Sequence, residues 1–334
     1  MQRTVVVGDI HGCFDELLDL LGKVELGPDD LLVNVGDVVD RGPAPGEVVE
    51  FLRTRPNTVV VMGNHERKHV RGIFSPSQEI TRLQLGDRYG DAVEWMRTLP
   101  YYFENDHVRV VHAALVPGVA LADQREEILC GSTSGERKLA ALFPDSRWYD
   151  HYDDARPVAF GHHVVGREPL VRAGRIFGLD TGACHGGNLT ALCLPEAALH
   201  AVPARTDHWL AVRRRWQLPV LKARPWRELS WRRLAEEVAR FSAEPDPATR
   251  DWIDRVEAWA GQLRSAFPAL AAAAQRVAGE LTADEIRPHP AAPLLFQARR
   301  GRLDQAVLAG WCGTPGRTID LAAALGLSLP EPPA

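Results

Sequence analysis

One pattern recurs through the first 200 residues of this 334-residue chain: a short β-branched or apolar run that ends abruptly in small and polar residues. The first run ends at Gly8 and Asp9, and the second ends at Gly36 and Asp37. Such runs predict buried β-strands that leave the sheet at a polar turn. The runs are Thr4–Val7, Leu31–Val35, Thr58–Met62, Val108–Val111, Val158–Phe160, Arg175–Leu179, Leu189–Leu194 and Leu199–Val202, the last two without polar residues behind them.

Helix-like stretches separate the early strands. They cover Phe14–Leu21, Glu47–Arg53 and Asp91–Met96. Alternation of strands and helices predicts an α/β core of two layers or more. In such sheets the carboxyl ends of the strands meet at one crevice, so the polar residues behind the strands are predicted to share a single site.

The pattern changes after Pro203. Apolar residues at helical spacing fill Leu229–Phe241, Trp252–Phe267 and Leu270–Leu281, and strand-like runs disappear. We therefore expect a catalytic α/β domain over residues 1–205 and a helical accessory domain over residues 206–334.

Composition excludes several classes of protein. Hydrophobic residues make up 45% and charged residues 25% of the chain, which is ordinary for a globular protein and argues against a disordered or collagen-like chain. The net charge of −5 gives no global reason to expect a nucleic acid or an anionic membrane as partner.

Cysteine usage and hydropathy bear on location. The five cysteines are scattered and form no C-x-x-C pair, which favours a reducing compartment over a disulfide framework. The first strand-like run begins near the first residue, so a signal peptide is not expected, and no apolar run approaches the ~20 residues of a membrane span. We expect a cytoplasmic protein without membrane contact.

The side chains behind the strands combine imidazoles with hard oxygen donors and include no thiolate. This set suits Mn, Fe, Zn or Ni ions and disfavours a cysteine-bound zinc. It is also too large for one ion once water is added, so a two-metal site with a shared carboxylate is the simplest interpretation. The set comprises Asp9, His11, Asp37, Asn64, His65, His112 and His162.

Five motifs occur in order and carry a family resemblance: Gly8-Asp-Ile-His-Gly12, Gly36-Asp-Val-Val-Asp-Arg-Gly42, Gly63-Asn-His-Glu66, His112 and Gly161-His162. Together they resemble the calcineurin-like metallophosphoesterases, specifically the phosphoprotein phosphatase branch. That branch also includes symmetrical diadenosine tetraphosphatases and the phosphatase module of bacterial polynucleotide kinase-phosphatase. The resemblance covers about residues 1–205 and implies a four-layered α/β/β/α sandwich.

The resemblance also implies roles for these residues. Asp9 and His11 would hold one metal ion, Asp37 would bridge, and Asn64, His112 and His162 would hold the second ion, with Mn expected first. A metal-bridging hydroxide would attack phosphorus, while His65, oriented by Asp40, would protonate the leaving oxygen. Arg41 and Asn64 would bind substrate phosphate, since an arginine can present two donors to phosphate oxygens.

Some assignments stay open at this stage. The family pattern takes the histidine directly after glycine, which favours His162 over His163. A second phosphate-binding arginine is usual in the branch, and Arg147 is a better candidate than Arg137. Asp180 and His185 lie in a glycine-rich loop and could serve catalysis or only shape the loop.

The substrate is also open. A phosphoserine or phosphothreonine protein, a dinucleoside polyphosphate, and a nucleic-acid phosphate end or 2′,3′-cyclic phosphate all present the same phosphoryl group. An alternative of another class is a regulatory or nucleic-acid-binding protein with a vestigial metal site.

Residues 208–233 interleave four tryptophans with eight basic residues. Stacking faces beside cations would suit single-stranded nucleic acid. The interpretation we favour is that the indoles anchor the helical region onto the catalytic domain while the arginines stay solvated, because tryptophans are common packing anchors.

Overall fold

The computed structural model describes residues 3–145 and 147–334. It divides into two compact units, Met1–Gln217 and Leu218–Ala334, here named the α/β unit and the helical unit. No helix in the described part of the chain combines the length and the apolarity needed to cross a membrane.

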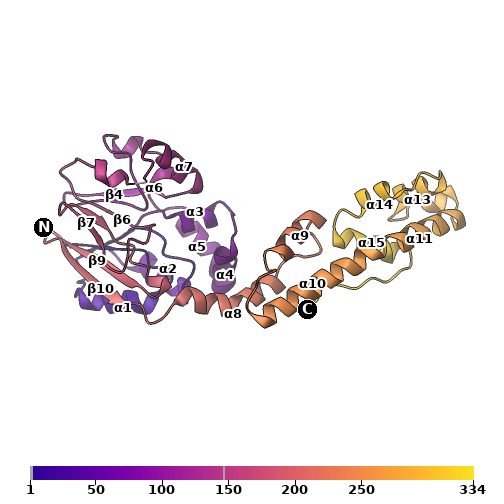
Figure 1. Ribbon diagram of the computed structural model, residues 1–334, viewed down its shortest axis with the longest axis horizontal. Helices are drawn as coiled ribbons and strands as arrows, with labels where there is room; N and C mark the ends of the chain where they lie inside the picture. Colours follow the sequence, from indigo (N-terminus) through magenta and orange to yellow (C-terminus); the bar gives the residue numbers. More distant parts are fainter. Residues whose placement is uncertain (1–2, 146) are drawn as a thin grey trace. The chain divides into compact units, whose positions relative to one another are not determined.

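The α/β unit contains two five-stranded mixed sheets (Figure 1). In the first, β1, β2 and β3 are parallel, β9 runs antiparallel to β1, and β10 runs antiparallel to β9. Its order is β10(Ala198–Pro203), β9(Asn188–Leu194), β1(Thr4–Val7), β2(Leu31–Asn34), β3(Thr58–Val60). The order in the second is β4(Tyr102–Glu104), β5(Arg109–Val111), β6(Val158–Phe160), β8(Ile176–Gly178), β7(Leu170–Arg172).

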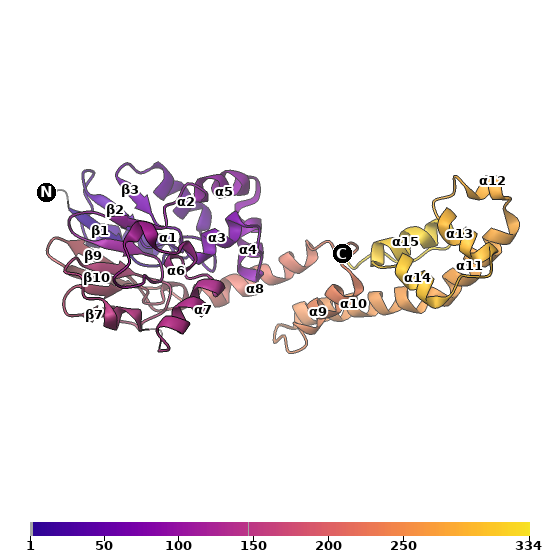
Figure 2. The ribbon, with the colours of Figure 1, turned by 90° about the horizontal axis from the view of Figure 1, so that it is seen from above.

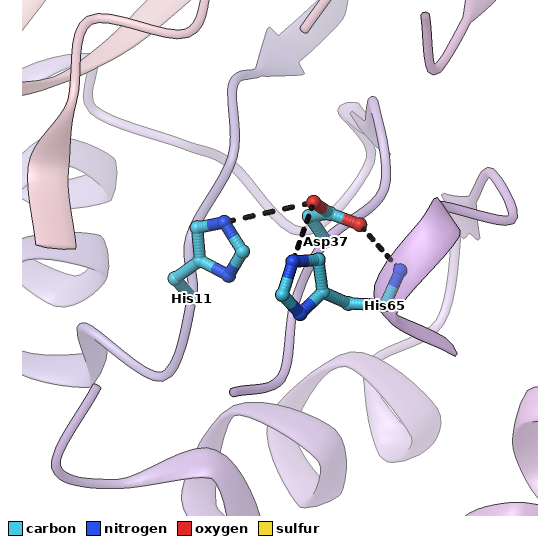
Figure 3. Close-up of side chains that lie close together, drawn as sticks. All are labelled: His11, Asp37 and His65. Carbon is cyan, nitrogen blue, oxygen red and sulfur yellow. Dashed lines mark hydrogen bonds and ion pairs between the residues drawn. The ribbon is translucent and has the colours of Figure 1, made fainter. Parts of the chain in front are cut away.

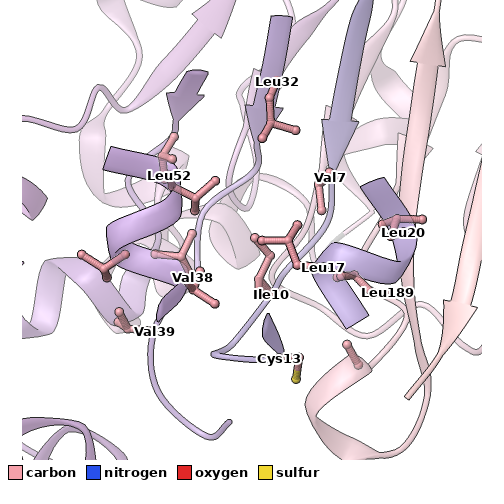
Figure 4. Close-up of a cluster of buried hydrophobic side chains, with 14 of the residues drawn as sticks. Val7, Ile10, Cys13, Leu17, Leu20, Leu32, Val38, Val39, Leu52 and Leu189 are labelled. Atoms are coloured by element: carbon pink, nitrogen blue, oxygen red, sulfur yellow. The ribbon is translucent and has the colours of Figure 1, made fainter. Parts of the chain in front are cut away.

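Side chains of β1 show why the two sheets stack. Val6 joins a buried cluster with Val110 and Ala159 of the second sheet, whereas Val5 and Val7 point to the opposite face. That face packs against α1(Phe14–Lys23) and α2(Pro45–Thr54) through residues such as Leu17 (Figure 4). Successive side chains of β1 thus point alternately to the helices α1 and α2 and to the second sheet. This alternation explains three of the layers: the helices, the first sheet and the second sheet.

The fourth layer covers the outer face of the second sheet. Phe160 and Ile176 pack there with Trp148 and with Leu139 of α7(Thr133–Leu142), and α6(Glu126–Leu129) adds Ile128. The predicted four-layered sandwich is confirmed. All eight predicted strands are present, whereas the edge strands β4 and β7 were not predicted because they are short and partly exposed.

Three further helices lie in the α/β unit between β3 and β4 and frame the site described below. They are α3(Asn64–Val70), α4(Pro76–Leu85) and α5(Tyr89–Met96). Only the last was anticipated from the sequence.

The helical unit contains only helices among its described elements (Figure 2). The three predicted helices are present, and α8 runs across the division between the two units. The bounds are α8(His208–Lys222), α9(Trp231–Ala239), α10(Pro247–Ser265), α11(Phe267–Glu280), α12(Ala283–Ile286), α13(Ala292–Arg299), α14(Gln305–Trp311) and α15(Pro315–Ala324).

Candidate metal centre

The predicted ligands follow the carboxyl ends of parallel strands. Asp9 and His11 follow β1, Asp37 follows β2, and Asn64 begins α3 shortly after β3. His112 follows β5 directly in the second sheet. Residues separated by more than 100 positions in the sequence therefore meet at one edge of the two sheets, as the strand pattern predicts.

Two groups of ligand atoms share Asp37. In the first, Asp37 Oδ2 lies 3.6 Å from His11 Nε2 and 3.8 Å from His65 Nε2 (Figure 3). In the second, Asp37 Oδ1 lies 3.4 Å from His112 Nε2, and His162 completes the group. All ligand atoms within each group lie within 4.8 Å of one another. One carboxylate between two sets of ligands is the arrangement that a bridging ligand requires.

Asn64 lies inside the second group. The amide atom that faces the cluster is 3.2 Å from both His112 Nε2 and His162 Nδ1, and 3.1 and 3.3 Å from the two Asp37 oxygens. An amide NH₂ in this place donates to these atoms, but its two N–H bonds cannot serve four acceptors at once. With the amide oxygen turned inward instead, the oxygen, the carboxylate and the two imidazoles form a donor set that fits a divalent cation.

Backbone carbonyls orient two of the histidines. His11 Nδ1 lies 2.9 Å from the carbonyl oxygen of Val39, and His112 Nδ1 lies 3.0 Å from that of Val35. Each Nδ1–H donates to its carbonyl, so each Nε2 turns a lone pair toward the cluster, which is the usual support for a metal-binding histidine. Burial lowers the pKa of His112 to about 4, and burial together with Arg41 lowers that of His11, so both rings are neutral.

The two carboxylates differ in their surroundings. Burial alone would raise the pKa of Asp37, but the imidazoles around it hold that pKa well below its usual range. Asp9 has the opposite balance, because burial and the neighbouring carboxylates Asp180 and Asp37 raise its pKa. Its two oxygens accept the backbone N–H of His162 at 3.3 and 3.1 Å.

Two glycines allow these close approaches. A Cβ at Gly63 would lie 2.2 Å from Asp37 Oδ1, and a Cβ at Gly161 would lie 1.9 Å from Asp9 Oδ1. Neither distance is compatible with a side chain. The glycines of the Gly-Asn-His and Gly-His motifs are therefore required by contact with the carboxylates.

Backbone strain is concentrated here. Nine non-glycine residues of the described chain have positive φ, and five of them belong to the site. Left-handed backbone is unfavourable for residues with a Cβ, and it persists where the surrounding structure enforces it. The five are His11 (φ 47°), Asp37 (53°), Asp40 (68°), Arg41 (66°) and His162 (72°).

Asp40 and Arg41 lie on the same loop and point to different partners. Asp40 Oδ2 accepts from His65 Nδ1 at 2.6 Å, as expected for an orienting carboxylate. Arg41 Nη1 lies 2.9 Å from His11 Nε2, so the guanidinium is at the ligand cluster and within reach of a phosphate there. Burial tends to raise the pKa of Asp40, but hydrogen bonds from His65 and His69 hold it well below its usual range.

Glu66 was not predicted as part of the site. Its carboxylate is fully buried and accepts the backbone N–H groups of Asp37, Val38, Val39 and Gly63 at 2.8 to 3.2 Å. It thereby fixes the loop that carries Asp37. The sequence did contain one indication of this role: Glu66 is the third residue of a helix that begins directly after Gly63, a position from which a glutamate can accept backbone N–H groups.

Glu136 of α7 is a second unpredicted neighbour. Its Oε1 lies 3.1 Å from His162 Nε2 and 3.4 Å from His163 Nε2. His162 turns Nδ1 to Asn64 and is mostly buried, whereas His163 is 61% exposed in its side chain. This placement supports the choice of His162 over His163.

The remaining candidates lie elsewhere. Arg147 is 57% exposed in its side chain and pairs with Asp145 and Asp150 at 3.8 and 3.9 Å. Arg137 is exposed on α7. The phosphate-binding role of Arg147 stays a prediction.

The glycine-rich loop and the first motif contribute three more residues. Asp180 is buried beside Asp9 and accepts from the backbone N–H of Gly182 at 3.0 Å, which fits loop shaping. His185 is exposed, and Cys13 is buried directly before α1.

Known proteins resemble this chain over somewhat more than half of its length. A symmetrical bis(5′-nucleosyl)-tetraphosphatase of Yersinia enterocolitica is 26% identical over 270 residues, covering 61% of this chain and 92% of that protein. A protein of the same description from Salmonella paratyphi C is 27% identical over 258 residues, covering 57% and 91%. A crystal structure described as a putative diadenosine tetraphosphatase is 27% identical with a TM-score of 0.50, covering 61% and 94%.

The family model of the calcineurin-like phosphoesterases matches residues 2–181, which is more than half of the chain and includes every residue of the two ligand groups. The match agrees with the two stacked sheets and with the position of the ligands behind the strands. The chain is a phosphoester hydrolase and belongs to the calcineurin-like phosphoesterase family.

Proposed function

We propose that the protein hydrolyses phosphoesters at a centre of two divalent metal ions, with His65 as general acid. The observation that supports this most directly is Asp37 shared between two groups of ligand atoms, the first with His11 and His65 and the second with His112 and His162. Asp9 belongs to neither group, and its assignment as a ligand rests on the family resemblance. Asp9 and His11 would hold one ion, and Asn64, His112 and His162 the other. When bound, the two ions would lower the pKa of water and offset charge on the phosphoryl oxygens; Mn is proposed first, with Fe, Zn and Ni as alternatives.

The protein side chains would supply the remaining chemistry. With Nδ1–H donated to Asp40, His65 turns Nε2 toward Asp37 and the ligand cluster, where a leaving oxygen would lie. As general acid, His65 would give the proton at Nε2 to that leaving oxygen, while Asp40 holds the ring in place through Nδ1. Arg41 would hold phosphoryl oxygens with its planar donors.

For the substrate, we propose phosphate monoesters of alcohols, such as phosphoserine or phosphothreonine, as the first class. The buried His65–Asp40 pair supports this choice, since an alkoxide leaves poorly unless it is protonated. Glu66 directly after the Asn-His pair is in keeping with the protein phosphatases of the branch.

A second class, dinucleoside tetraphosphates, is supported by the relatives. The Yersinia and Salmonella proteins are described as symmetrical bis(5′-nucleosyl)-tetraphosphatases and match most of their length to this chain. Symmetrical cleavage of such a substrate yields two nucleoside diphosphates.

Contact with nucleic acid has less support. Trp226 is buried with its Nε1–H donated to the Leu221 carbonyl at 2.7 Å, and Arg227 pairs with Asp320 and Glu331. Both side chains therefore have partners inside the helical unit.

Five buried free cysteines support a reducing, cytoplasmic location.

Substrate class is tested with purified protein, Mn²⁺, a phosphoserine peptide and diadenosine tetraphosphate, with His65→Ala as the variant. Release of inorganic phosphate from the peptide, slowed by about 10²-fold or more in His65→Ala, is the expected result. If the protein forms ADP from diadenosine tetraphosphate and releases no phosphate from the peptide, dinucleoside tetraphosphates replace phosphate monoesters as the proposed substrate class. Hydrolysis of neither, or hydrolysis unaffected by chelation, would contradict the proposed function.

A further inference from the structure

Asp40 has more partners than the pairing with His65 requires. Its side chain is fully buried, and Asp40 Oδ1 accepts from His69 Nε2 at 2.9 Å while Oδ2 accepts from His65 Nδ1 at 2.6 Å. The amide of Gln78 also donates to Oδ2. Each carboxylate oxygen is thus assigned to a different histidine of the same helix, α3.

The position of His69 on α3 explains this arrangement. His65 and His69 are four residues apart, so they lie one above the other on one face of the helix. Both histidines bind Asp40 through one ring nitrogen, but the other nitrogen has a different neighbour in each. Nε2 of His65 faces the ligand cluster, 3.8 Å from Asp37 Oδ2. His69 is 2% exposed and has Asp40 on one ring nitrogen and Tyr89 on the other.

Two further helices fix these groups. Tyr89 at the start of α5 has its hydroxyl 3.1 Å from His69 Nδ1. With Nε2–H donated to the carboxylate, Nδ1 of His69 is the ring nitrogen that can accept a hydrogen bond from the Tyr89 hydroxyl. Gln78 of α4 accepts the Ser75 backbone N–H at 3.1 Å through Oε1, so its NH₂ group is turned to Asp40.

We propose that His69 is a positioning residue of the proton-donating pair: by holding Asp40 Oδ1, it prevents the carboxylate from rotating away from His65 and fixes the His65 proton at Nδ1. Tyr89 and Gln78 complete this support. Among the described residues, the hydrogen bonds of His69 go to Asp40 and Tyr89 and none goes to the ligand groups, so His69 acts only through Asp40. The inference rests on the proposed role of His65 as general acid.

The inference implies a selective defect. A substrate whose leaving group is already a stable anion does not need the proton from His65, whereas a substrate with a basic leaving oxygen does. Loss of His69 should therefore slow phenyl phosphate far more than 2,4-dinitrophenyl phosphate. A residue that serves only the packing of α3 would slow both substrates equally.

The experiment compares kcat/KM of the full-length protein for both substrates with Mn²⁺, in wild type, His65→Ala, His69→Ala, His69→Gln and Tyr89→Phe. We expect His69→Ala to lose about tenfold or more on phenyl phosphate and less than about twofold on 2,4-dinitrophenyl phosphate. His69→Gln should recover most of the loss, because its amide N–H can replace Nε2–H. Tyr89→Phe, a milder change that keeps the ring, should show the same selectivity with a smaller loss.

His208→Ala is the matched control. His208 is another mostly buried histidine paired with a carboxylate, since its Nε2 lies 2.7 Å from Glu16 Oε1, but it has no bond to Asp40. It should leave the ratio of the two rates unchanged. Metal content and thermal midpoint of each variant show whether any loss arises from unfolding.

The possible failures are distinguishable. If His65→Ala is selective but His69→Ala and Tyr89→Phe slow both substrates equally, the positioning role is wrong and the general-acid role stands. If His69→Gln loses as much as His69→Ala, the hydrogen bond to Asp40 is not the cause. If His65→Ala is itself unselective, the proposed general acid and this inference are both wrong.

Discussion

The two units use buried polar groups in opposite ways. In the α/β unit, acceptor atoms of Asp37, His112 and His162 crowd around the Asn64 amide at 3.1 to 3.3 Å. In the helical unit, the buried Trp226 and Trp259 donate their ring N–H groups to the carbonyls of Leu221 and Pro330, at 2.7 and 2.8 Å, whereas the ring N–H of buried Trp252 has no hydrogen-bond partner among the described residues.

This difference separates a functional cluster from a structural one. A donor that faces one acceptor is satisfied within the protein, whereas several acceptors around one amide outnumber its two N–H bonds and suit a cation. Abundance of tryptophan and arginine in residues 208–233 was therefore a weaker signal of function than a few histidines and carboxylates behind strands.

The largest expected effect would come from removing the shared ligand. Asp37→Ala should lower kcat/KM for p-nitrophenyl phosphate by roughly 10⁴-fold, since both ligand groups lose a member and several kcal/mol of charge stabilisation are lost. Metal content measured on the purified variant should fall in parallel.

The control for this change is Asp154→Ala. Asp154 belongs to the same unit but pairs with Arg109 at a part-exposed site. It should keep both metal and activity. Wild-type activity in Asp37→Ala would contradict the two-metal assignment and remove the distinction between the units.

The second effect concerns the helical unit. Trp226→Ala should destabilise this unit by about 3–5 kcal/mol, because the ring is 2% exposed and packs 5.5 Å from that of Trp252. Hydrogen exchange should accelerate in α10 but not in β1, and kcat/KM should stay within about twofold of wild type.

Trp209→Ala is the control, because Trp209 is half-buried on the part of α8 that belongs to the α/β unit, and this change should leave hydrogen exchange in α10 unaltered. A large fall in kcat/KM of folded Trp226→Ala would show that the helical unit contributes to hydrolysis. In that case the buried polar groups of the helical unit could not be described as purely structural.

The smallest effect tests an ordinary polar pair inside the α/β unit. Burial tends to raise the pKa of Glu16, but hydrogen bonds from His208 and from the Arg205 backbone N–H lower it from 4.5 to about 2. The ionised carboxylate therefore contributes stability above pH 4.5, and that contribution is lost as the pH falls toward 2.

His208→Ala should accordingly cost about 1–2 kcal/mol at pH 7 in denaturant unfolding. The difference from wild type should shrink between pH 4.5 and pH 2. A difference that stays constant over that range would assign the loss to packing instead of to the hydrogen bond.

Local patterns in the sequence predicted eight of the ten described strands and the edge of the sheets at which the candidate ligands meet. β-Branched runs identify the strands, and strand ends identify the edge where Asp9, Asp37 and His112 meet. The short edge strands β4 and β7 lack that pattern, since they are partly exposed and only three residues long.

Supporting residues were harder to predict. Glu66, His69 and Gln78 act through contacts between α3, α4 and the Asp37 loop, and only the assembled helices bring them together. α3 itself was not predicted, because its seven residues are nearly all polar and give no apolar periodicity. Had that helix been recognised, the i, i+4 spacing of His65 and His69 would have placed both on one face.

The left-handed backbone at His11, Asp37, Asp40, Arg41 and His162 has a consequence for attempts to engineer this protein. At Asp40, glycine would relieve the conformational cost but would leave His65, His69 and Gln78 without their shared acceptor. At Arg41, whose guanidinium is only part-buried, glycine would relieve the cost with less loss, so selection for heat resistance alone would favour it there. Selection for turnover would oppose that replacement if Arg41 binds phosphate as proposed, so Arg41 is the position where thermostability and turnover are expected to conflict.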